Sequence, residues 1–294
     1  MAAELLEREE YVEQSYFFRA YRERLADAIP SQEILAQIRE ELLNTTHLPT
    51  ALELIEGELL LRGQLVDGMR LLAHYFTPFQ IFVIGKSEDE KGKFDQVTAL
   101  DVLEKEAEYR AGEPTPQGLF IYQFEAISRN HLGYDRGLEA VAGDPIYDEA
   151  FCEWILKIRT QLGAVDFADM VYIRSEQMVI DQRRQRGVAD WQAEHTILFG
   201  HKEGRIAKAN RGKDPLYMFA ALQRQLHFPR VPRRRKAEDI ELDPVLERRL
   251  QILEKRLQLA ESELKGGVDL SKFYAKPEPE NEPLPPEAAG SDNQ

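Results

Sequence analysis

Apolar residues recur at steps of three and four positions through most of the first half of the chain, which is the spacing of one face of an α-helix. The first clear example covers residues 11–28, where aromatic and aliphatic side chains have Glu and Arg between them. A later segment begins at Pro49 and ends at Gly63, in keeping with the preference for proline in the first helical turn and glycine after the last. Short connections between such segments favour antiparallel helices packed as a bundle.

Two segments fit a strand as well as a helix. Residues 79–84 (Phe-Gln-Ile-Phe-Val-Ile) are short, β-branched and aromatic, although the Thr-Pro pair before them would equally start a helix. Residues 170–174 could form a strand, but the broad apolar stripe through residues 167–186 favours one long helix there.

One segment of the second half predicts a β-hairpin. Residues 196–210 are Thr-Ile-Leu-Phe-Gly, then His-Lys-Glu, then Gly-Arg-Ile-Ala-Lys-Ala-Asn, so two strand-like runs flank a short polar turn. Gly204 suits the left-handed position that a loop of three to five residues needs. We therefore expect a small hairpin within an otherwise helical region.

The carboxyl end changes character. Between residues 246 and 264 apolar residues alternate at four- and three-residue steps, which predicts a short coiled coil, and from residue 268 onward a Pro- and Glu-rich composition is typical of disorder. The predicted fold is mostly α: a helical bundle-like body with the small β-hairpin, a short C-terminal coiled-coil helix and a disordered tail. A rigid connector at 113–116 divides the body. The expected regions are 1–112 (N-terminal helices), 113–236 (second helical region with the basic hairpin), 237–267 (coiled-coil helix) and 268–294 (acidic, Pro-rich tail).

Composition narrows the class of protein. The 294 residues are 43% hydrophobic, too apolar for a chain disordered throughout, and include one cysteine, Cys152. A single cysteine cannot form an internal disulfide, so we expect a reducing compartment and a cytoplasmic protein. The first ten residues are acidic and helix-like and do not resemble a charged-then-apolar leader. The longest apolar stretch, residues 76–85, is too short to span a bilayer as a helix, so no membrane partner is expected.

Charge is distributed unevenly along the chain. The net charge is −14, yet residues 181–236 contain fourteen Lys and Arg against five acids and carry +9, which leaves −23 for the remainder. Cationic side chains at this density can bind phosphates, with an affinity that falls as salt rises. The candidate residues for binding an anion or a nucleic acid are Arg183, Arg184, Arg186, Lys202, Arg205, Lys208, Arg211, Lys213, Arg224, Arg230, Arg233, Arg234, Arg235 and Lys236.

Three interpretations of this basic segment are open. It could pair with the acidic helices of the same chain, which is the default because so much negative charge is available. It could bind nucleic acid, with neighbouring aromatic side chains stacking on bases, although helical spacing would place Phe219 in the core. It could also bind an acidic protein or another anion. The aromatic candidates are Phe199, Tyr217, Phe219, His227 and Phe228.

No motif indicates catalysis, a metal or a cofactor. The Gly-Lys-Ser sequence at 85–87 resembles the end of a phosphate-binding loop, but Gln80 stands where that loop needs its first glycine. The six histidines never fall at the His-x-x-x-His spacing of a zinc-binding helix. Cys152 lies in an amphipathic segment where a small buried residue is usual, and helix capping and surface pairs explain the polar cluster at 128–136. We therefore predict no catalytic residue, no metal site and no cofactor.

These observations favour a non-enzymatic cytoplasmic interaction or adaptor protein. Its partner would be another protein or a second copy of the chain. The C-terminal helix could pair with a second copy or a different partner, or it could pack on the body of the same chain. The alternative is a nucleic-acid-binding protein that uses the basic residues between 183 and 236. A third hypothesis is an enzyme whose site is assembled from residues distant in sequence, which motifs do not reveal.

Overall fold

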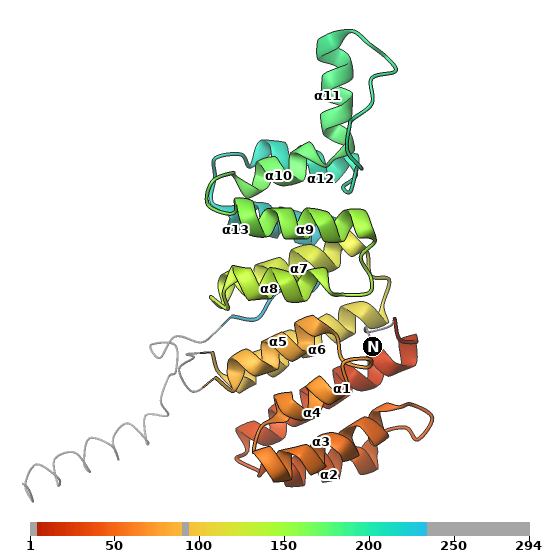
Figure 1. The fold of residues 1–294 in the computed structure, drawn as a ribbon, viewed down its shortest axis with the longest axis vertical. Coiled ribbons are helices and arrows are strands. Elements are labelled where there is room, and N and C mark those ends of the chain that lie inside the picture. Colours follow the sequence, from red (N-terminus) through yellow and green to blue (C-terminus); the bar gives the residue numbers. More distant parts are fainter. Residues whose placement is uncertain (1–4, 90–93, 234–294) are drawn as a thin grey trace, which may run out of the picture. The chain divides into compact units, whose positions relative to one another are not determined.

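Helices make up the regular secondary structure of the residues that the computed structural model describes, 5–89 and 94–233 (Figure 1). Extended segments pair there only through two isolated bridges, Leu162 with Val165 and Ser175 with Phe199. The prediction of a mostly α fold is confirmed for these residues. The described helices are α1 (Arg8–Ala26), α2 (Ser31–Glu41), α3 (Leu48–Arg62), α4 (Leu65–Leu71), α5 (Pro78–Ser87), α6 (Gln96–Ala111), α7 (Pro116–Arg129), α8 (Tyr134–Ala142), α9 (Glu149–Gln161), α10 (Phe167–Ile173), α11 (Glu176–Arg186), α12 (His201–Ala209) and α13 (Pro215–Leu226).

The chain divides into two units, Met1–Arg234 and Arg235–Gln294, and all the described helices belong to the first. The coiled-coil helix predicted at 237–267 and the tail predicted at 268–294 lie outside the described residues, so both stay predictions. The division between 1–112 and 113–236 likewise stays a prediction.

The ambiguous apolar run at 79–84 is helical and lies within α5. Thr77 starts this helix with a capping box: Thr77 Oγ1 accepts a hydrogen bond from the Gln80 amide at 3.3 Å, and Gln80 Oε1 accepts one from the Thr77 amide at 3.1 Å. Phe79 and Val83 are fully buried, so tertiary packing supports the helix that the cap begins. Among the described helices, α5 included, none combines the length and the apolar run needed to cross a membrane.

Residues 167–186 form two helices, α10 and α11, where we expected one long helix. Ser175 starts α11, and its side chain accepts a hydrogen bond from the first turn of that helix. The break is also held from outside, because the Glu176 amide donates to the Phe199 carbonyl at 3.0 Å. The Ser175 cap and the hydrogen bond to the Phe199 backbone therefore separate α10 from α11, although the apolar stripe in the sequence is continuous.

The β-hairpin predicted at 196–210 is wrong, because residues 201–209 form α12 and the extended run before them makes the isolated bridge to Ser175. Gly204, expected in a turn, lies on the buried face of α12. A Cβ on Gly204 would lie 2.2 Å from Ser175 Oγ, so a side chain there would prevent this packing. Buried Ala207, three residues on, continues the same helical face.

Helices far apart in sequence pack together in the core: α1 against α6, α5 against α8, and α7 against α13. A buried polar network crosses from α6 towards α9. Arg110 donates hydrogen bonds to Glu106 at 2.8 Å and to Asp144, which lies in the connection between α8 and α9. Gln123 donates to Glu106 at 2.9 Å and accepts from the Tyr147 hydroxyl at 2.8 Å. These bonds offset the cost of burying charged groups and link α6 and α7 to the connection between α8 and α9.

Candidate anion-binding surface

Several of the predicted anion-binding residues come together where α11 meets α12. The two helices touch at their first turns, where the Glu176 carboxylate accepts a hydrogen bond from the His201 amide at 3.0 Å. The carboxylate is favoured there because the amino end of α12 carries the positive end of its dipole. Gly204 permits the close approach, since a Cβ on it would also lie 2.7 Å from Gln177 Cβ.

An open groove of about 570 Å³ lies between these helices. Its lining residues recur at helical spacing, so one face of each helix contributes to it. Three of them are exposed cations, Arg184, Arg205 and Lys208, and one is an acid, Asp181. The groove is therefore positive overall. It is lined by Gln177, Ile180, Asp181, Arg184, His201, Arg205, Lys208 and Ala209.

Asp181 is held in place by three donors. Its Oδ2 accepts hydrogen bonds from Lys208 Nζ at 2.7 Å and from the Tyr172 hydroxyl at 2.8 Å, while Oδ1 accepts one from Gln177 Nε2 at 2.9 Å. Burial raises the pKa of Asp181, but these hydrogen bonds together with the Lys208 charge outweigh it, so the pKa lies below its ordinary value of 3.8. Asp181 is therefore ionised at neutral pH and offsets part of the groove's positive charge.

Tyr172 forms a platform beside the groove. The Arg211 guanidinium carbon lies 3.9 Å from the centre of its ring, and Lys208 Nζ lies 5.9 Å from it, so both cations contact the aromatic face. Arg211 is also paired with Asp169 at 2.6 Å. Burial, and then the hydrogen bond to Asp181, raises the pKa of Tyr172 to about 12, so its hydroxyl stays protonated as a donor.

Eleven of the fourteen candidate cations lie within the described residues, and all eleven are exposed. Of these eleven, only Lys208 and Arg211 form ion pairs with a described carboxylate. Both partners, Asp181 and Asp169, belong to the same region, 113–236. The acidic helices of the first half therefore do not cover these residues. The other three candidates, which lie outside the described residues, are Arg234, Arg235 and Lys236.

The candidate cations do not form a single site. Arg184, Arg205 and Lys208 line the groove, whereas Arg224 lies on α13. Residues 230–233 return towards α7, because the Asn130 side chain donates a hydrogen bond to the Pro232 carbonyl at 3.0 Å. Sequence alone indicated the charge of this region but not which residues share a groove.

Most of the aromatic residues expected to stack on bases are unable to do so. Phe199, Phe219 and Phe228 are all buried, whereas the Tyr217 side chain is 69% exposed at the start of α13. Any nucleic acid on this surface would therefore be held mainly through its phosphates.

Tyr172, Gln177 and His201 are site residues that the sequence interpretation missed. Tyr172 resembled one more member of an apolar helical stripe, and its contact with Asp181 depends on the break at Ser175. The Ser-Glu pair that starts α11 was the signal that could have revealed this break.

The polar groups weighed for catalysis have structural contacts. In the cluster at 128–136, the Tyr134 hydroxyl donates to Ser128 Oγ at 2.9 Å, and Asp135 pairs with Arg159 at 2.6 Å. Burial, followed by nearby acids, raises the pKa of the Cys152 thiol, which disfavours the reactive thiolate. The Gly-Lys-Ser sequence at 85–87 lies at the end of α5, where its amides belong to a helix and cannot form a phosphate cradle.

Comparison of the chain with protein-family models, with curated proteins and with solved structures finds no match in any of the three. Function must therefore be argued from the residues of the groove and their surroundings.

Proposed function

We propose that this chain is a non-enzymatic binding protein whose α11–α12 groove holds the phosphate backbone of a nucleic acid. The observation that carries the proposal is the exposure of all eleven described cations of the basic segment, of which two are paired with acids. Exposed cations without acid partners keep their charge available for a ligand. The single cysteine supports a place in the cytoplasm, where nucleic acids are present.

Phosphate contacts fit the groove better than base contacts. Arg184 and Arg205 extend from different helices into one opening, so two cations can contact neighbouring phosphates of one strand. Burial of Phe199 and Phe219 removes two of the aromatic platforms that sequence-tolerant single-strand binders use. Binding should accordingly depend steeply on salt and little on base sequence.

The second candidate function is that of a protein-interaction or adaptor protein with an acidic partner. It is favoured by Leu216 and Tyr217, which are 41% and 69% exposed at the start of α13, beside exposed Lys213. Apolar and aromatic side chains next to a cation are typical of protein interfaces. Self-association through residues 246–264 remains a separate proposal, which the mass of the full chain and of a chain ending at Asp239 would test.

The main test compares a groove variant with a charge-matched control. Arg184→Gln with Arg205→Gln removes two cations from the groove, and Arg19→Gln with Lys157→Gln removes two exposed cations from α1 and α9. Fluorescence anisotropy of a labelled 20-nucleotide duplex gives the affinity over a range of salt concentrations. We expect the groove variant alone to give a salt slope about two shallower, because each phosphate contact contributes about 0.9 to the slope of log K against log salt.

A labelled poly-glutamate peptide serves as the acidic-protein probe. If the peptide binds tightly and the duplex does not bind, the nucleic-acid proposal is wrong and the ligand of the groove is an acidic protein. Equal weakening in the groove variant and the control would show that only total charge matters, and would overturn the assignment to this groove.

A further inference from the structure

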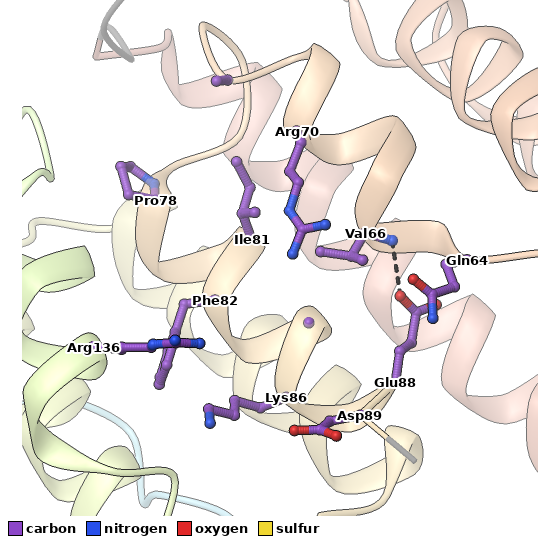
Figure 2. Close-up of a pocket in the computed structure, with 12 residues that line it drawn as sticks. Gln64, Val66, Arg70, Pro78, Ile81, Phe82, Lys86, Glu88, Asp89 and Arg136 are labelled. Atoms are coloured by element: carbon purple, nitrogen blue, oxygen red, sulfur yellow. Dashed lines mark hydrogen bonds between the residues drawn. The ribbon is translucent and has the colours of Figure 1, made fainter. Parts of the chain in front are cut away.

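A second open pocket, separate from the basic groove, lies among α4, α5 and α8. It has a volume of about 570 Å³, within the range of small-molecule sites (Figure 2). The three helices are brought together by the packing of α5 against both of the others. The lining residues are Gln64, Val66, Arg70, Ala73, Pro78, Ile81, Phe82, Gly85, Lys86, Glu88, Asp89 and Arg136.

Each helix contributes one cation to the pocket. Figure 2 shows the Lys86 and Arg136 side chains in the part of the pocket around Phe82, whereas the Arg70 guanidinium lies beside Val66. Arg70 uses Nη1 to pair with Asp67 at 2.9 Å. Within the described residues neither Lys86 nor Arg136 forms an ion pair with a carboxylate, so their charges are available to a ligand.

Glu88, one of the two acids in the lining, is already committed to the fold. Its Oε1 accepts a hydrogen bond from the Leu65 amide at 2.7 Å. Its Oε2 accepts one from the Val66 amide at 2.9 Å (Figure 2), and the two bonds cap the amino end of α4. Burial raises the pKa of Glu88, and the two backbone hydrogen bonds only partly offset this. The other acid, Asp89, is exposed, as are Arg70 and Arg136, so the lining has three cations against two acids, one of which caps α4.

The remaining wall of the pocket is apolar and partly open. Phe82 is half-buried, and Lys86 Nζ lies 5.8 Å from the centre of its ring. Gly85 has no side chain that would occupy the pocket: a Cβ there would lie 3.2 Å from Val66 Cγ2 and 3.8 Å from Arg70 Nη2. The missing side chain leaves space beside Val66 and the Arg70 guanidinium.

We propose that this pocket binds a small aromatic anion, a planar ring that carries a phosphate or a carboxylate group. The anionic group contacts Lys86 and Arg136, because charge-assisted hydrogen bonds are the strong ones. The ring lies against Phe82, since stacked or tilted aromatic pairs gain more than their area alone provides. This site shares no residue with the α11–α12 groove, so each proposal can be tested independently of the other.

The test is calorimetric titration of the full chain with phenyl phosphate and with benzoate, which distinguish the two anionic groups. Inorganic phosphate and phenol supply the charge and the ring alone. We expect saturable binding of phenyl phosphate, benzoate or both, with each single-feature probe at least about ten-fold weaker. Lys86→Gln with Arg136→Gln should weaken the bound aromatic anion about ten-fold or more, whereas Arg19→Gln with Lys157→Gln and the groove variant Arg184→Gln with Arg205→Gln should not.

If neither phenyl phosphate nor benzoate binds saturably, the proposal is wrong. It is also wrong if the pocket variant binds the aromatic anion as tightly as the wild type does. Phenol binding as tightly as phenyl phosphate would overturn the role of the cations. Thermal unfolding followed by circular dichroism shows that the pocket variant is folded.

Phe82→Leu then tests the ring: loss of the preference for phenyl phosphate over inorganic phosphate supports stacking, and an unchanged preference contradicts it.

Discussion

Lys208 Nζ lies 2.7 Å from Asp181 Oδ2, so one cation of the basic groove is paired with the acid that lies in the same groove. The pair is about half exposed on the lysine side, where solvent and salt weaken its attraction. Asp181 also orients the Tyr172 hydroxyl and the Gln177 amide. The acid therefore organises the groove while reducing the positive charge that a ligand meets.

Removal of the Asp181 charge should strengthen nucleic-acid binding. Asp181→Asn keeps an acceptor oxygen for Tyr172 and frees Lys208, so we expect the duplex to bind up to about five-fold more tightly at low salt, the range of an exposed ion pair. The measurement is anisotropy against the labelled duplex. Asp190→Asn makes the same change of charge at an exposed position that does not line the groove. Equal gains in both variants would contradict a local role for Asp181.

Arg110 should be one of the most sensitive positions in the fold. Its side chain and those of Glu106 and Asp144 are at most 1% exposed, so Arg110→Met would leave two carboxylates buried without their cation. We expect the free energy of unfolding in urea to fall by about 3–5 kcal/mol, the cost of breaking a buried pair. Arg159→Met, which removes a cation that is 33% exposed, should cost less than about 1 kcal/mol.

A double variant separates the charge effect from the loss of packing. Adding Asp144→Asn to Arg110→Met removes one of the orphaned charges, so the combined loss should be smaller than the sum of the two single losses. Strict additivity would show that Arg110 acts through packing alone.

Local signals in the sequence predicted much of the helical framework. Thr115 and Asp214, each followed by proline, accept hydrogen bonds from the first turns of α7 and α13, as a cap-plus-proline start requires. Gly63 adopts the left-handed conformation at the end of α3. These features depend on residues within one turn of each other, so periodicity and capping rules detect them.

Contacts between distant segments account for what the sequence did not predict. From the sequence Gly204 resembled a turn residue. Its actual role, the close approach to Ser175, is made across the α11–α12 interface and leaves no local signal in the sequence. The sequence indicated the density of basic residues but left open whether acidic helices cover them, and the convergence of Arg184 with Arg205 follows from how the two helices pack. Arg136 was interpreted from the sequence as a member of a surface pair, because α8 reaches the second pocket only by packing on α5.

Glu88 should make the stability of the fold fall as pH rises above its unfolded pKa. Burial raises the folded pKa above 4.5, so the folded state binds the proton more tightly than the unfolded state does. The stability that Glu88 contributes is therefore full below about pH 4.5 and is lost as pH rises through the folded pKa. Glu88→Gln, which does not titrate, should give a flatter dependence of the urea midpoint on pH over this window. Glu153→Gln, an exposed change on α9, should reproduce the wild-type slope, and an identical slope in Glu88→Gln would contradict the assignment.

Replacing glycine by alanine at two helical positions, Gly204 and Gly57, should change the free energy of unfolding in opposite directions. Gly204→Ala places a Cβ 2.2 Å from Ser175 Oγ and 2.6 Å from Ser175 Cβ, so α12 must move away from α11, at a cost of about 1–3 kcal/mol in unfolding free energy. Gly57→Ala, within α3, meets no atom within 4 Å and should raise that free energy by about 0.5–1 kcal/mol. Because the groove depends on the close approach of its helices, Gly204→Ala should also weaken duplex binding while Gly57→Ala leaves it unchanged. If Gly204→Ala keeps full affinity despite a measured loss of stability, ligand binding does not require the groove as it is built here.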